Sequence, residues 1–178
     1  MIFLNFQKKL IVVILSLGSN LTSKWGTPKE TLLKSYKYFN SKDIKIVKKS
    51  SFYESEAIPN KKDPKFINSI IVVETSYTPF KLINYILSVE KKFLRVRSEP
   101  NSPRTLDIDI IDFKNKIVNI KTSILDLQIP HPRLENRNFV LYPIKEVFNK
   151  WKSPLSGKSI DHLIDKLDSK SKKNITII

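Results

Sequence analysis

Decisive for the fold is the stretch Pro103-Arg104-Thr105-Leu106-Asp107-Ile108-Asp109-Ile110. Apolar and acidic residues alternate along it, and side chains two residues apart on a β-strand point to the same face. The leucine and the isoleucines are therefore expected in the core, while Asp107 and Asp109 project together from the opposite face. We predict a strand over residues 105–113 that presents two carboxylates side by side.

Two neighbouring carboxylates repel each other unless a cation lies between them. Magnesium is bound by one or two carboxylates and fills its remaining positions with water and phosphate oxygens, and two metal ions about 4 Å apart could be bridged by such a pair. Asp107 and Asp109 are therefore candidate metal ligands of a phosphate-transferring enzyme. The alternative, from this motif alone, is an exposed strand face with two solvated acids.

The rest of the chain alternates between strand and helix patterns. Strands are predicted over residues 10–16, 44–53, 66–75, 105–113 and 117–120, and helices over residues 27–39, 80–94, 137–148 and 159–167. The order β-α-β-β-α-β predicts an α+β, ferredoxin-like antiparallel sheet with helices on one face and extra C-terminal helices. The opposite face of this sheet is expected to stay open for ligands.

Arginine is concentrated around the acidic pair. All five arginines lie between Arg95 and Arg137, although the 32 basic residues are spread along the chain. A planar guanidinium binds phosphate through two parallel hydrogen bonds, which lysine cannot do. Arg95 and Arg97 end a predicted helix and Arg104 follows a loop with two prolines, an arrangement that favours a lid over polyphosphate. The helix dipole is an alternative explanation for the first two arginines but not for Arg104.

Two further segments supply candidate pocket residues. In Ile129-Pro130-His131-Pro132-Arg133 a histidine stands between prolines that fix the backbone, with Arg137 nearby, which favours a phosphate contact. In Asp63-Pro64-Lys65-Phe66-Ile67-Asn68, the phenylalanine and the asparagine share one strand face, where a ring and a carboxamide can hold a flat heterocycle. The second histidine, His162, fits a helical surface pattern and receives no role.

The composition fits one globular domain. The chain has 178 residues, a hydrophobic fraction of 40% and no cysteine, which excludes disulfides and cysteine-based zinc sites. The N-terminus has the pattern of a signal peptide, because Lys8-Lys9 precede the apolar residues 10–15. The apolar run is, however, too short to span a bilayer. We expect residues 1–9 to be an extension, 10–168 a single domain and 169–178 a tail, in a cytoplasmic, monomeric enzyme with no membrane partner.

The net charge of +15 keeps a second class of function open. A basic nucleic-acid-binding domain of ferredoxin-like topology would carry such a charge, but it needs exposed aromatic residues on its central strands for base stacking. The strand over residues 105–113 offers two aspartates instead, which would repel a phosphate backbone unless metal is present. A metal-dependent nuclease shares the acidic pair but leaves Phe66, Asn68 and Phe139 unexplained. We therefore expect no specific nucleic-acid partner.

Together and in this order, the motifs resemble those of the 6-hydroxymethyl-7,8-dihydropterin pyrophosphokinases, a family of folate-pathway enzymes. The resemblance covers residues 10–167 and rests most heavily on the specific run around Asp107 and Asp109. The other matching groups fall at compatible spacings: Leu17-Gly18-Ser19-Asn20, Ser51-Phe52-Tyr53-Glu54-Ser55-Glu56, Pro64-Lys65-Phe66-Ile67-Asn68, Glu90 with Arg95-Val96-Arg97, Pro130-His131-Pro132-Arg133 and Arg137-Asn138-Phe139-Val140-Leu141.

The resemblance implies that the β,γ-diphosphate of ATP moves to the pterin hydroxymethyl group and that AMP is released. It implies two Mg²⁺ ions on Asp107 and Asp109, with Arg95 and Arg104 stabilising the transfer from a closing loop. The other implied contacts are Glu90, Arg97, His131 and Arg137 at ATP, the backbone around Ser55, Ala57 and Ile58 at the pterin edge, and Phe66, Asn68 and Phe139 around the pterin ring.

The chain departs from the family pattern in three places. Leu94 stands where the family usually has glycine before the first loop arginine, and its Cβ is expected to restrict a hinge. Asn101-Ser102 replaces the loop tryptophan and glycine of some members, and Ser55-Glu56-Ala57 replaces Thr-Glu-Pro, which loses a rigid turn. The segment just before Pro130 aligns poorly and receives no role.

Overall fold

The computed structural model describes residues 10–96, 101–121 and 126–178. The strands are β1 (Ile11–Ser19), β2 (Asn40–Ser41), β3 (Ile44–Lys49), β4 (Tyr53–Ser55), β5 (Phe66–Thr75), β6 (Asp107–Phe113), β7 (Val118–Lys121), β8 (Asp126–Ile129) and β9 (Ile175–Ile177). The helices are α1 (Pro28–Ser35), α2 (Pro79–Lys92), α3 (Asn138–Val147), α4 (Ile160–Lys166) and α5 (Ser169–Lys173), with 3₁₀ turns η1 (Tyr36–Phe39) and η2 (Leu134–Asn136).

One antiparallel sheet forms the centre of the molecule. Its strands follow the order β2-β3-β5-β1-β6, and β4 pairs with β5 on one edge and with β9 on the other. β7 and β8 form a separate two-stranded sheet. The mixed helix and antiparallel-sheet class predicted from the sequence is confirmed.

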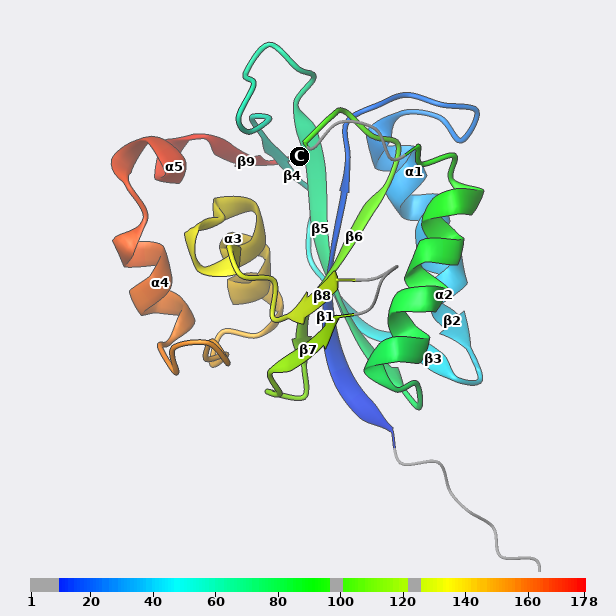
Figure 1. Cartoon of the computed structure of the whole chain (residues 1–178). Coiled ribbons are helices and arrows are strands. Elements are labelled where there is room, and N and C mark those ends of the chain that lie inside the picture. The colour runs from blue at the N-terminus through cyan, green and yellow to red at the C-terminus, as the bar shows by residue number, and fades with distance from the viewer. Residues whose placement is uncertain (1–9, 97–100, 122–125) are drawn as a thin grey trace, which may run out of the picture.

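Helices cover both faces of the sheet (Figure 1). On β1, Val13, Leu15 and Leu17 belong to a core shared with α1 and α2. Ile14 points the other way and belongs to a second core, which includes residues of α3 and α4. The prediction of helices on one face only is therefore wrong, because α3 and α4 bury their apolar sides against part of the opposite face. The rest of that face, which includes Ser16, lines a cavity and stays open.

The strand predicted over residues 44–53 is divided into β3 and β4. The β3–β5 register shifts between Ile46 and Lys48, which marks a bulge. After β3, the backbone N–H of Ser51 donates to Oε1 of Glu146 on α3 at 2.9 Å. The chain thus leaves the ladder with β5 and rejoins it at β4. Residues 169–178, predicted to be a tail, contain α5 and the edge strand β9.

Helix α2 begins and ends through recognisable caps. The side chain of Thr78 accepts a hydrogen bond from the N–H of Lys81, and Pro79 occupies the first turn. At the other end, the N–H of Leu94 donates to Lys91 O at 3.0 Å and that of Arg95 to Glu90 O at 3.1 Å. These two bonds form a Schellman motif, in which the residue after the cap takes the left-handed conformation. The helix therefore stops before residue 94, its predicted end.

Leu94 has a φ of 63°, in the region that favours glycine. Its side chain is 45% exposed and contributes little to the core. We expect Leu94→Gly to raise the free energy of unfolding by about 1 kcal/mol, because a Cβ in the left-handed region costs about that much. Urea unfolding followed by circular dichroism measures the change.

Leu33 provides the matched control, since it lies inside α1 and is 49% exposed. Leu33→Gly should lower the free energy of unfolding by about 1 kcal/mol, the usual cost of glycine within a helix. Equal losses of stability in both variants would show that Leu94 is not strained.

Candidate active site

Three neighbouring strands build the floor of the candidate site. It consists of Phe66 and Asn68 from β5, Ser16 and Gly18 from β1, and Asp107 and Asp109 from β6. In the ladder Gly18 lies opposite Asn68 on one side and opposite Asp107 on the other. A Cβ on Gly18 would lie 3.1 Å from Oδ1 of Asn68 and 3.6 Å from the ring of Phe66. Glycine therefore leaves room for the amide and the ring at the centre of the floor.

A cavity of about 240 Å³ lies above this floor. It joins the acidic pair to the predicted heterocycle slot in one space. The remaining lining residues are Ser55, Glu56, Ile58, Asn101, Arg104, Arg133, Asn136, Arg137 and Phe139. The carboxylates, Arg104 and Arg137 from the predicted set of arginines, and both predicted stacking rings thus surround the same volume.

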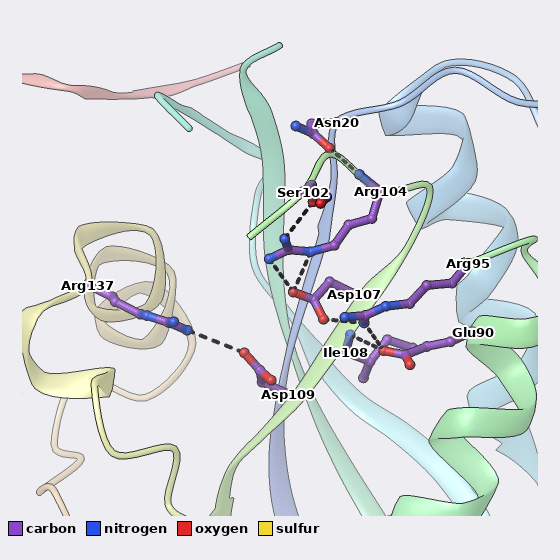
Figure 2. A network of polar contacts seen from close by, with 9 residues as sticks. All are labelled: Asn20, Glu90, Arg95, Ser102, Arg104, Asp107, Ile108, Asp109 and Arg137. Carbon is purple, nitrogen blue, oxygen red and sulfur yellow. Dashed lines mark hydrogen bonds and ion pairs between the residues drawn. The ribbon is translucent and has the colours of Figure 1, made fainter. Parts of the chain in front are cut away.

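Asp107 is held by two arginines (Figure 2). Arg104 donates from Nε to Oδ2 of Asp107 at 2.8 Å, and its Nη2 lies 2.6 Å from the same oxygen. Arg95 contacts Oδ1 through Nη1. Burial by itself raises the pKa of Asp107, but the two guanidinium groups outweigh this effect and hold the pKa below its usual range. Asp107 is therefore ionised and compensated.

Asp109 is compensated much less. Nη1 of Arg137 lies 3.4 Å from its Oδ2, a long contact for an ion pair. Burial and then the negative charge of Asp107 raise the pKa of Asp109 to about 7, against the opposing effect of Arg137. The pair of carboxylates therefore lacks positive charge on the Asp109 side, as expected of a site that receives a cation.

Glu90 lies behind Asp107 and does not line the cavity (Figure 2). Its side chain is 4% exposed. Its Oε1 accepts a hydrogen bond from the backbone N–H of Ile108 at 2.9 Å and also contacts Arg95. Glu90 therefore ties α2, β6 and Arg95 together. Arg95 is likewise absent from the cavity lining, because its guanidinium lies between Glu90 and Asp107.

Two arginines lie over the rings of the predicted slot. The guanidinium of Arg104 is 4.9 Å from the ring centroid of Phe66, and that of Arg137 is 5.4 Å from the centroid of Phe139. The side-chain N–H of Asn68 donates to Oγ of Ser55 at 2.9 Å. The slot is thus connected to the acidic pair through Arg104, which contacts Asp107, and Arg137, which contacts Asp109.

Two other predicted residues, Ala57 and His131, are absent from the lining of this cavity. Ala57 is buried and lines a neighbouring cavity. His131 accepts the N–H of Arg133 at Nδ1 over 3.0 Å. Burial, together with Arg137 and Arg133, lowers the pKa of His131 to about 4, so the neutral ring carries its hydrogen on Nε2 and can donate it. Arg97 lies outside the described residues.

Asn20 is a connecting residue to which the sequence analysis gave no role. It is buried, and its Oδ1 accepts the N–H of Arg104 at 2.7 Å. Its Nδ2 donates to Pro64 O at 3.0 Å, so one side chain joins the end of β1 to the segments before β5 and β6. The turn Leu17-Gly18-Ser19-Asn20 was visible in the sequence, but its long-range partners were not. The sequence likewise did not show that six further residues line the cavity: Ser16, Gly18, Glu56, Asn101, Arg133 and Asn136.

The side chains that could hold a metal ion suit magnesium better than a metal whose ligands all come from the protein. Among the described residues, no group of three or more acidic, histidine or cysteine side chains could hold a metal ion. Two carboxylates facing a cavity lined with arginines suit an ion that takes most of its ligands from water and phosphate.

Across the described ranges, no helix has the length and apolar content needed to cross a bilayer.

Known proteins with similar sequences are folate-synthesis enzymes. The chain is 33% identical over 139 residues to a 2-amino-4-hydroxy-6-hydroxymethyldihydropteridine pyrophosphokinase of Haemophilus influenzae, covering 78% of this chain and 82% of that protein. It is 37% identical over 125 residues to the Synechocystis enzyme of the same name, covering 70% of this chain and 62% of that protein. A folic acid synthesis protein of Pneumocystis carinii is 35% identical over 155 residues, which cover 87% of this chain but 20% of that protein.

Solved structures share the fold of this chain. The Plasmodium falciparum HPPK-DHPS protein superposes with a TM-score of 0.71 at 17% identity, over 96% of this chain and 48% of that one. The chain thus spans about half of that protein. The family model for 7,8-dihydro-6-hydroxymethylpterin-pyrophosphokinase matches residues 14–149, which contain both aspartates and both slot rings. The chain therefore belongs to the 7,8-dihydro-6-hydroxymethylpterin-pyrophosphokinase (HPPK) family.

Proposed function

We propose that this protein transfers the β,γ-diphosphate of ATP to 6-hydroxymethyl-7,8-dihydropterin and releases AMP, a step of folate biosynthesis. The observation that carries the proposal is the single cavity that joins Asp107 and Asp109 to the slot between Phe66 and Phe139. A polyphosphate needs the acidic and arginine side of this cavity, and a flat heterocycle needs the aromatic side. Membership of the HPPK family supports the same reaction.

In this reaction the pterin hydroxyl group loses its proton to solvent, and its oxygen bonds to the β-phosphorus. The bond between that phosphorus and the oxygen bridging to the α-phosphate breaks, and AMP keeps the bridging oxygen. Asp107 and Asp109 would hold two Mg²⁺ ions, which neutralise phosphate charge when bound. Arg95 and Arg104 stabilise charge on the transferring group with their planar guanidiniums. Arg137 lies on the other side of Asp109, where it can bind the nucleotide phosphates.

The remaining residues position the two substrates. The rings of Phe66 and Phe139 stack on the pterin, and the carboxamide of Asn68 bonds its polar edge. The backbone around Ser55, Ala57 and Ile58 completes that edge. The neutral ring of His131 donates from Nε2 to ATP, and Arg97 is assigned to the nucleotide. Glu90, predicted at the nucleotide, would act there through Arg95, which its carboxylate contacts. Exclusion of water from the cavity strengthens each of these charged contacts.

The finer structural and cellular assignments belong to the same proposal. The order β3-β5-β1-β6 supports a ferredoxin-like βαββαβ arrangement, in which the second and third strands are neighbours and the first separates the third from the fourth. We infer a single domain, predicted over residues 10–168 and extended by β9, which pairs with β4. We also infer a monomeric protein and a cytoplasmic location. Small molecules are the proposed partners, with no specific nucleic acid and no membrane partner.

The decisive assay supplies ATP, Mg²⁺ and the hydroxymethyl dihydropterin and measures AMP and pterin diphosphate. Asp109→Asn is the matched variant, because it keeps the shape of the side chain and removes the charge that would hold Mg²⁺. We expect its turnover to fall by at least about a hundredfold, the effect of losing a major electrostatic stabiliser.

Two results would contradict this assignment. If the wild-type protein forms no AMP and no pterin diphosphate, the proposed reaction is wrong. If Asp109→Asn keeps its turnover within a few-fold of wild type at saturating Mg²⁺, only the metal-binding role of Asp109 is wrong.

Arg104 tests whether geometry or charge is needed at the transferring phosphate. Arg104→Ala should lower kcat by about 10³-fold, with a much smaller effect on ATP affinity, because the guanidinium acts mainly in the transition state. Arg104→Lys should recover little of this loss, since an ammonium cannot donate two parallel hydrogen bonds. Steady-state kinetics with both substrates measures the split. Complete recovery with lysine would mean that charge alone suffices.

Salt dependence separates this enzyme from a basic nucleic-acid-binding protein. Non-specific nucleic-acid affinity falls by orders of magnitude between about 50 and 200 mM salt, because counterions are released. Pterin affinity, measured by fluorescence with a non-hydrolysable ATP analogue and Mg²⁺ and corrected for nucleotide occupancy, should change little over that range. Phe139→Ala should weaken it by about 1–3 kcal/mol, the scale of one stacking partner.

A labelled oligonucleotide titrated in parallel provides the comparison. Salt-resistant, sequence-selective oligonucleotide binding without measurable pterin binding would favour the nucleic-acid function over the enzyme.

A further inference from the structure

The family model ends at residue 149, yet the chain beyond it returns to the candidate site. After α4, the segment of α5 and β9 crosses from the α3 side of the molecule to the edge of the sheet at β4 (Figure 1). β9 pairs with β4 antiparallel, placing Ile175 opposite Ser55 and Ile177 opposite Tyr53. We call residues 168–178 the return segment.

The return segment supports a strand that carries one wall of the cavity. β4 has three residues, and such a short strand has little stability by itself. Its pairing with β5 on one side and β9 on the other bonds its backbone along both edges. Ser55 at the end of β4 accepts the side-chain N–H of Asn68 at 2.9 Å, and both residues line the cavity. The position of this wall therefore depends on β9.

Asn138 connects the return segment to the opposite wall. It is buried at the first turn of α3, immediately before Phe139. Its Nδ2 donates to Ser171 O at 2.7 Å and lies 3.4 Å from Asn174 O. Its Oδ1 accepts the backbone N–H of Phe139 at 2.6 Å. The carboxamide of Asn138 therefore forms hydrogen bonds both within α3, at Phe139, and to the return segment.

Asn174 closes the connection. Its Nδ2 donates to Oε2 of Glu56 at 3.1 Å, and Glu56 follows β4 and lines the cavity. The path of hydrogen bonds runs from Phe139 through Asn138 to the return segment, and from there to Glu56 and Ser55. None of these contacts involves the carboxylates or arginines of the nucleotide side.

We propose that Asn138 is a positioning residue which, through the return segment, fixes the separation of the Phe139 wall and the β4 wall and thereby sets affinity for the flat heterocycle. The inference rests on the proposed function, in which that heterocycle is the pterin. Asn138 touches neither substrate in this scheme. Its effect is therefore expected on pterin binding and not on the phosphate chemistry.

The test compares Asn138→Ala and Asn138→Asp in the full chain. The aspartate keeps an oxygen for the N–H of Phe139 but loses the donor to Ser171 O. Each variant should raise the Kd for the pterin, measured by fluorescence with a non-hydrolysable ATP analogue and Mg²⁺, by about tenfold, the effect of one buried hydrogen bond. The KM for ATP should change by less than about twofold, as expected of a contact that does not reach the nucleotide.

Backbone hydrogen exchange gives a readout independent of turnover. The N–H groups of β4 should exchange faster in both variants, because local opening of the strand costs less free energy. Lys172→Ala is the control in the same segment: Lys172 is exposed, and its Nζ donates to Asp165 O, away from the cavity. It should leave the pterin Kd and β4 exchange unchanged.

Two outcomes overturn the inference while the proposed function stands. One is an unchanged pterin Kd in both Asn138 variants of an active enzyme. The other is a parallel loss of ATP affinity, pterin affinity and melting temperature, which would make Asn138 a general stabilising residue. A wild-type protein that binds no pterin and forms no AMP overturns the proposed function and this inference together.

Discussion

The repulsion between Asp107 and Asp109 is the constraint on which the rest of the site depends. Two carboxylates two residues apart on one strand face cannot both ionise in a buried cavity without compensation. The protein compensates them unequally, with two arginines at Asp107 and a long contact to Arg137 at Asp109. The shortage of positive charge beside Asp109 supports the proposal of a cation there. The same burial and the same neighbouring charge of Asp107 raise the pKa of Asp109.

The floor shows how a local glycine gives the cavity its depth. Because Gly18 lies between Asn68 and Asp107 in the ladder, any side chain there would rise between the heterocycle slot and the acidic pair. A Cβ would already be within 3.1 Å of Asn68. The continuity of the cavity therefore depends on sheet register as much as on the residues that contact substrate. A one-residue slip would send the functional side chains into the other core.

Strong periodicity made the central features predictable from sequence. The alternation around Asp107 fixed both the strand and the shared face of the carboxylates, and Phe66 and Asn68 follow the same rule on β5. The sequence did not show which segments far apart in the chain lie next to each other. β4 and β9 are each three residues long, too short for a periodic signal, and they depend on each other and on β5 for pairing. The burial of Glu90 behind Asp107 likewise depends on how α2 packs against β6, which local pattern does not encode.

Two arginines of the site are held by the protein through several contacts each. Arg95 is held to α2 through its backbone bond to Glu90 O and through the Glu90 carboxylate, while the backbone of Arg104 is bonded to Asn20. Leu94, in the left-handed conformation, directs the chain so that Arg95 can return to Glu90. Both guanidiniums are thus held at defined positions against Asp107. In the proposed transfer, guanidiniums that are already held near the phosphates need little reorganisation to stabilise the developing charge.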